Sequence, residues 1–62
     1  MATAKELKEC RKAIAVERAD QAMYQRCADN ATDDDVRRWN QNRANYAAEA
    51  ADDYERWLRE NS

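Results

Sequence analysis

The feature that most constrains this chain is the complete absence of glycine and proline from its 62 residues. These are the residues that most strongly interrupt helices, and they also dominate the tight turns between strands. Thirteen alanines, together with many Arg, Glu and Gln residues, add high intrinsic helix propensity. The sequence therefore predicts an all-α fold in which very few residues lie outside helices.

The first predicted helix covers residues 4–29. Thr3 followed by Glu6 matches a capping box, in which the two side chains satisfy amide groups of the first turn. Asn30 is expected to end the helix, because asparagine tolerates the left-handed conformation that glycine adopts at this position elsewhere. A short link at residues 30–32 follows.

The second predicted helix covers residues 33–60. Thr32 with Asp35 repeats the capping signal, and the acids from Asp33 to Asp35 place negative charge at the positive end of the helix dipole. On the outer side, acids precede bases by four residues, a spacing that stabilises an isolated helix by about 0.2–0.5 kcal/mol per pair. The four predicted pairs are Asp33 with Arg37, Asp34 with Arg38, Asp52 with Arg56, and Glu55 with Arg59.

The short link predicts that the two helices pack as antiparallel neighbours in a hairpin. Apolar side chains recur at helical spacing in both helices. In the second helix they fall within about a third of a turn, whereas in the first helix the apolar stripe drifts around the cylinder. The drift has the sense expected for left-handed supercoiling but is faster than the roughly 20° per heptad of a regular coiled coil. The alternative explanation is that the first helix contacts two neighbours. The predicted interface residues are Leu7, Ile14, Val16, Met23, Tyr24, Val36, Trp39, Tyr46, Ala50, Tyr54, Trp57 and Leu58.

A hairpin of this length is expected to need a partner. Short chains bury a small fraction of their surface, and scaffolds of this size usually depend on a disulfide, a metal or a second chain. The apolar side chains here exceed what two helices can cover between themselves. We therefore predict a homodimer that forms a four-helix bundle of coiled-coil type, with a different host protein as the alternative partner.

Antiparallel pairing places residue i opposite a residue numbered about 62 minus i. The bulky aromatic residues of the second helix are then expected to face smaller or aliphatic residues of the first. Two of the expected contacts are Tyr24 with Trp39 and Val16 with Tyr46. Such interdigitation of large and small side chains is what a well-packed core requires.

The same pairing predicts a polar layer in the middle of the bundle. Arg43 falls near Glu17 or Asp20, and Asp53 falls near Arg11. Arg43 and Asp53 lie on the apolar stripe, where an unpaired buried charge is costly, so ion pairing is expected if they are covered. The alternative is that both side chains reach water at the edge of the interface.

The two cysteines, Cys10 and Cys27, lie 17 positions apart on one helix. This is a separation of about 25 Å, which excludes a disulfide within the chain. Small buried thiols are the favoured interpretation, and a covalent link from Cys10 to Cys27 of an antiparallel copy is the alternative. Without histidine or a CxxC pair no metal site is expected, and the run Asp33–Asp35 is interpreted as helix capping.

The sequence offers no chemistry for catalysis. It has no histidine, its one serine is the terminal Ser62, and no glycine loop is present to hold a phosphate, so neither an enzyme nor a cofactor is expected. The net charge of −2 selects no ligand class. No apolar run approaches the roughly 18 residues that a membrane span needs, and no signal-peptide stretch opens the chain, so a cytoplasmic location is expected.

The leading hypothesis is a non-enzymatic protein–protein interaction or regulatory protein that self-associates through its aromatic-rich face. Trp39, Tyr46 and Trp57 are its expected anchors, because large aromatic residues often dominate interface energies. Small size and self-association would suit an accessory protein of a phage or another mobile element.

The alternative hypothesis is a helical-hairpin dimer that binds RNA or DNA. The chain is similar in size and expected architecture to the RNA-binding plasmid copy-number regulators, although no residue motif is shared with them. Such binding would weaken steeply as salt increases. The outer basic residues that would make the contacts are Lys8, Lys12, Arg37 and Arg38.

Overall fold

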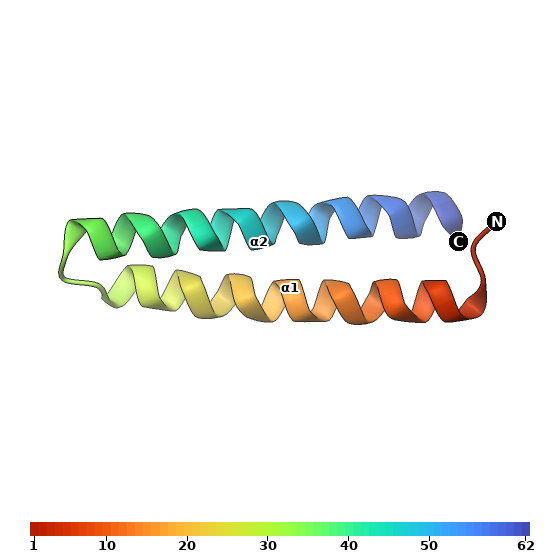
Figure 1. Ribbon diagram of the computed structural model, residues 1–62, viewed down its shortest axis with the longest axis horizontal. Helices are drawn as coiled ribbons and strands as arrows, with labels where there is room; N and C mark the ends of the chain where they lie inside the picture. The colour runs from red at the N-terminus through yellow and green to blue at the C-terminus, as the bar shows by residue number, and fades with distance from the viewer.

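The chain folds into a hairpin of two long antiparallel helices (Figure 1). The structure is a computed structural model that describes residues 1–62. Helix α1 spans Ala4–Asn30 and helix α2 spans Asp34–Asn61, so the all-α hairpin is confirmed and each helix boundary lies within one residue of its predicted position. The two ends of the chain lie together at the end opposite the turn (Figure 1). Neither helix contains a stretch long and apolar enough to cross a bilayer.

Helix α1 begins with the predicted capping box. The Glu6 amide donates to the Thr3 hydroxyl at 3.1 Å, and the Thr3 amide donates to the Glu6 carboxylate at 2.9 Å. Two amides that the first turn would leave unpaired are thereby satisfied. Thr3 itself has the extended backbone typical of an N-cap residue.

The predicted end of α1 and the predicted cap of α2 are both wrong. Asn30 remains helical, with its side-chain amide donating to the Arg26 carbonyl, and no residue in the chain has a positive φ. Ala31 leaves the helix in an extended conformation, which needs no glycine-like residue. Asp33, not Thr32, is the N-cap of α2, and its carboxylate accepts the Asp35 and Val36 amides. A charged acceptor on two amides outcompetes a hydroxyl one residue earlier.

Small side chains, and not the aromatic ones, fill the space between the helices. The prediction that bulky residues of α2 pack against α1 is wrong for Val16 and Tyr46, which remain 58% and 73% exposed. No large side chain is fully buried in the chain. The alanines allow the two helices to approach closely, and this close seam leaves no room for larger residues. The buried residues of the seam are Cys10, Ala28, Asn40, Ala44, Ala47 and Ala51.

The surface ion pairs of α2 form at a spacing of three residues and not the predicted four. Asp33 is occupied as the N-cap, so Arg37 pairs with Asp34 at 2.8 Å and Arg38 pairs with Asp35 at 3.5 Å. Further along, the predicted acids Asp52 and Glu55 turn towards α1, and Arg56 pairs with Asp53 instead. Exposed pairs of this kind each stabilise the helix by less than about 1 kcal/mol.

Candidate functional site

One side of the hairpin carries a cluster of two aromatic rings and an arginine. The rings of Tyr24 on α1 and Trp39 on α2 meet edge to face, with centroids 6.0 Å apart. The guanidinium of Arg43 lies over both rings, 5.2 Å from the centroid of Trp39 and 5.8 Å from that of Tyr24. The contact confirms the predicted pairing of Tyr24 with Trp39. We call these three residues the aromatic cluster.

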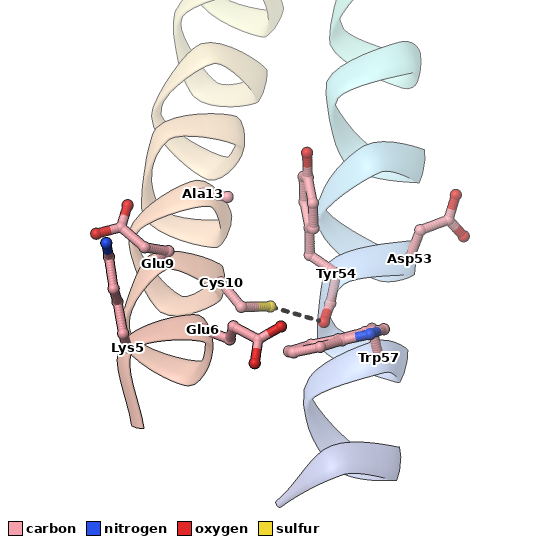
Figure 2. Close-up of a pocket in the computed structure, with 8 residues that line it drawn as sticks. All are labelled: Lys5, Glu6, Glu9, Cys10, Ala13, Asp53, Tyr54 and Trp57. Carbon is pink, nitrogen blue, oxygen red and sulfur yellow. Dashed lines mark hydrogen bonds between the residues drawn. The ribbon is translucent and has the colours of Figure 1, made fainter. Parts of the chain in front are cut away.

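A groove of about 650 Å³ lies near the other end of the same side, between the two helices (Figure 2). Its floor contains Cys10, whose thiol donates to the Tyr54 carbonyl at 3.3 Å, as the dashed line in Figure 2 marks. The indole of Trp57 forms one wall, and the Glu6 carboxylate points towards it across the groove (Figure 2). The eight lining residues are Lys5, Glu6, Glu9, Cys10, Ala13, Asp53, Tyr54 and Trp57.

The opposite side of the hairpin is polar, and its side chains form ion pairs and hydrogen bonds between the two helices. Arg18 on α1 bridges Asp52 at 2.8 Å and Glu55 at 3.1 Å, and hydrogen bonds to the Asp52 and Glu55 carboxylates raise the pKa of Arg18 above its usual value. Gln25 and Gln41 exchange two side-chain hydrogen bonds across the same side. These contacts tie the helices together along one edge and leave the other edge apolar.

The predicted interface residues divide into two groups. Leu7, Ile14 and Leu58 are half-buried and help to close the hairpin itself. The others form what we call the apolar face, which runs from the aromatic cluster to the groove and includes both tryptophans, Trp39 at 55% and Trp57 at 37% exposure. The apolar face consists of Val16, Met23, Tyr24, Val36, Trp39, Tyr46, Ala50, Tyr54 and Trp57.

The predicted polar layer does not form within the hairpin. Arg43 makes no ion pair with Glu17 or Asp20, and lies over the aromatic rings instead. Asp53 pairs with Arg56 of its own helix and not with Arg11. Asp53 is exposed on the apolar face, outside the seam, and Arg43 contacts α1 at the ring of Tyr24 and not at an acid. The ion pair that does join the helices, through Arg18, lies on the polar side.

The two cysteines differ in their surroundings. Cys10 is 7% exposed and its thiol is engaged in the seam, whereas Cys27 is exposed, so the prediction of two buried thiols holds for Cys10 alone. No disulfide joins them. The acidic run near the turn has the predicted capping role through Asp33, and no three side chains of metal-ligating type converge anywhere in the chain.

The basic residues considered for nucleic-acid binding are not brought together. Lys8 and Lys12 flank Cys10 near the chain ends, whereas Arg37 and Arg38 lie in the first turns of α2, at the other end of the hairpin. Both arginines are engaged with neighbouring carboxylates, and Arg37 also donates to the Ala31 carbonyl. No continuous basic surface results.

Three features of the site were missed in the sequence: the groove, the aromatic–arginine contact and the Arg18 bridge. The signal for Arg18 was present, since acids of α2 lie within the reach of a long side chain from α1. A comparison with protein-family models, curated proteins and solved structures finds no match to this chain.

Proposed function

We propose that this chain is a non-enzymatic protein–protein interaction module that self-associates through its apolar face into a four-helix bundle. The supporting observation is the distribution of its aromatic residues: the seam buries only small residues, while Trp39, Tyr46 and Trp57 remain on the surface. Monomeric proteins rarely leave contiguous apolar patches of more than a few hundred Å² in water.

The total surface of the chain supports the same proposal. The hairpin exposes 4726 Å², against about 4,200 Å² expected for a compact folded monomer of its 7.3 kDa mass. The four aromatic side chains of the apolar face that are more than a third exposed add roughly 400 Å² of ring surface, taking about 200 Å² for each fully exposed ring; they are Trp39, Tyr46, Tyr54 and Trp57. A typical specific interface buries about 800 Å² on each partner, so these exposed rings alone would provide about half of that area.

The elongated shape of the hairpin also suits stacking. The molecule measures 47 × 14 × 10 Å and consists of one layer of two helices, so two copies placed face to face form a bundle of two such layers. Helices in such bundles pack at interaxial distances of about 8–10 Å. A regulatory or accessory role is the kind of function that a self-associating module without catalytic groups serves.

The test is the mass of the particle in solution, measured by light scattering and sedimentation. The wild type is expected at about twice 7.3 kDa. Tyr46→Glu places a charge at the most exposed aromatic position of the face and is expected to give 7.3 kDa. Asn45→Glu is the matched control, because Asn45 is exposed and hydrogen-bonded to Gln41 on the polar side, and is expected to keep the wild-type mass.

A folded wild-type monomer at high protein concentration would overturn the proposal. Dimerisation that survives Tyr46→Glu unchanged would also overturn it, because association would then use another surface. Binding to nucleic acid, the alternative function, has no supporting observation in the arrangement of the four basic residues. A gel shift at low and high salt measures it directly.

A further inference from the structure

The apolar face carries two features of opposite charge at its two ends. The aromatic cluster lies nearer the turn, where Trp39 is 55% exposed, and carries the guanidinium of Arg43. The groove, which is hollowed nearer the chain ends, is lined by three carboxylates and one lysine. An exposed cationic feature and a recessed acidic feature on one face are what a self-complementary surface requires.

These features are placed symmetrically about Ala48 in α2. Trp39 and Trp57 each lie nine residues from Ala48, and Arg43 and Asp53 each lie five residues from it. Tyr46 and Ala50 each lie two residues away. The spacings between these six positions alternate between four and three residues, which is the spacing of a coiled-coil seam.

Two charged side chains on the face are not fully paired within one chain. Arg43 forms no ion pair of its own, although its guanidinium rests on two rings. Asp53 bonds Arg56 through one carboxylate oxygen only, which leaves Oδ2 without a partner. Burying either charged group against an apolar surface would cost free energy, whereas an ion pair between Arg43 of one copy and Asp53 of a second copy would offset that cost.

Building on the self-association proposed above, we propose that two copies pair head to tail about a two-fold axis level with Ala48. The aromatic cluster of each copy enters the groove of the other, and Arg43 pairs with the partner's Asp53. Trp39 then lies against the partner's Trp57, and Tyr46 packs over the partner's Ala50. Each contact occurs twice, as two-fold symmetry requires.

Helix α1 is consistent with this axis. Cys10 lies level with Tyr54, and Tyr24 lies level with Trp39, so Ala48 lies level with about residue 16 of α1. Val16, which is 58% exposed, is therefore expected to meet Val16 of the second copy. In the same register, Lys12 lies opposite the partner's Asp20, a further pair of opposite charge.

Charge reversal tests the Arg43 to Asp53 pairing. Arg43→Asp brings two acids together at both contacts of a homodimer, and Asp53→Arg brings two bases together at both contacts. Each variant alone is expected to dimerise at least about tenfold more weakly than the wild type, since like charges facing each other cost several kcal/mol. An equimolar mixture is expected to recover affinity as a heterodimer, because both contacts again join opposite charges.

Native mass spectrometry and sedimentation report the two homodimers and the heterodimer. Arg26→Asp, at an exposed arginine without an ion pair, is the control for loss of positive charge and is expected to leave dimerisation unchanged. A mixture with no preference for the heterodimer would overturn the register. Circular dichroism of each variant identifies any that fail to fold. If a single variant does not fold, the double variant Arg43→Asp/Asp53→Arg replaces it in the test, and this variant is expected to dimerise with wild-type affinity.

Cross-linking tests the direction of pairing independently of charge. In a background with Cys10→Ala and Cys27→Ser, Val16→Cys is expected to form a disulfide-linked dimer on mild oxidation, because the axis passes beside this position. Ala15→Cys, exposed but turned away from the face, is the matched control and is expected to stay unlinked. Equal linking of the two variants would overturn the proposal.

The results of these experiments distinguish a failure of the head-to-tail register from a failure of self-association. A monomeric wild type would remove both proposals. A wild-type dimer that tolerates both single charge reversals, and in which Val16→Cys stays unlinked, would remove the head-to-tail register alone. In that case the copies would pair in parallel, with α1 over the partner's α2.

Discussion

At the scale of single residues, two arginines in the interior of their helices have opposite surroundings. Arg18 lies on the polar side and bridges Asp52 and Glu55, while Arg43 lies on the apolar face above Tyr24 and Trp39. The guanidinium suits both settings, because it binds carboxylates through a planar fork and also stacks on rings. The residue type alone therefore does not reveal which setting an arginine occupies.

Glu6 provides a pH-dependent test at this scale. The Thr3 backbone N–H, which donates to the Glu6 carboxylate, and then the Thr3 hydroxyl lower the pKa of Glu6 below its ordinary value of 4.5. A lowered folded-state pKa means that the stabilisation is complete above pH 4.5 and is lost as pH falls through the folded-state pKa. NMR titration of the Glu6 side chain is expected to show a midpoint below 4.5.

Glu6→Gln provides the matching stability comparison. The wild type is expected to be more stable than this variant at neutral pH, and the difference is expected to shrink in acid below the Glu6 midpoint. Glu49→Gln, at an exposed carboxylate outside the groove and without a cap partner, is the control for the loss of one negative charge. A Glu6 midpoint at or above 4.5 would contradict the capping interaction.

At the scale of elements, the close alanine seam determines which faces of the two helices remain outside. Ala44, Ala47 and Ala51 turn the narrow, small-residue side of α2 towards α1. The aromatic stripe of the same helix is consequently rotated onto the surface, where Trp39 and Tyr46 lie. Two helices joined through small residues bury little apolar area, so the large apolar side chains of the stripe stay partly exposed.

A larger residue in the seam is expected to destabilise the hairpin. Ala47→Leu adds volume where Ala47 is 4% exposed, and overpacking of this kind typically costs about 1–3 kcal/mol. Ala19→Leu makes the same change at an exposed position of α1 and is expected to cost less than about 0.5 kcal/mol. Urea unfolding followed by circular dichroism measures both. An equal effect of the two substitutions would show that the seam is not tightly packed.

The start of α2 offers a second test at this scale, because sequence and structure name different caps. Asp33→Ala removes the acceptor of the Asp35 and Val36 amides and is expected to cost about 1 kcal/mol. Thr32→Ala is expected to be nearly neutral, since Thr32 makes no capping hydrogen bond. Thermal unfolding of both variants decides between them. A larger loss for Thr32→Ala would restore the sequence-based assignment.

At the scale of the whole molecule, the hairpin is an elongated slab. Its radius of gyration is 14.2 Å, whereas a compact domain of 62 residues is expected near 10.6 Å. An elongated single layer of two helices has no interior comparable to that of a globular domain. Its folded state is therefore expected to be stabilised largely by association.

Coupled folding and association predicts a concentration-dependent melting temperature. Because dilution favours separated chains, a tenfold dilution is expected to lower the Tm of a dimer of this size by roughly 5 °C. Calorimetry or circular dichroism over a hundredfold range of concentration measures the effect, with Tyr46→Glu as the control that should show none. A wild-type Tm that stays constant over this range would contradict the dimer.

The sequence by itself determined the helical character, the two segments and the first cap, because these depend on local propensities and on contacts within four residues. The absence of glycine and proline indicated the helices, and the Thr3–Glu6 pair indicated the cap of α1. The periodicity also identified the apolar stripe of α2 correctly.

Only the tertiary structure decided which part of each helix faces the other. The level of a residue along the hairpin follows from the numbering, so the contact of Tyr24 with Trp39 was predictable. The rotation of each helix about its axis depends on the closest packing of both surfaces at once, and here it favoured Ala47 and Ala51 over the larger residues. That rotation placed Arg43 and the tryptophans on the surface beside the seam, whereas the antiparallel pairing had set the aromatic residues of the second helix against the first.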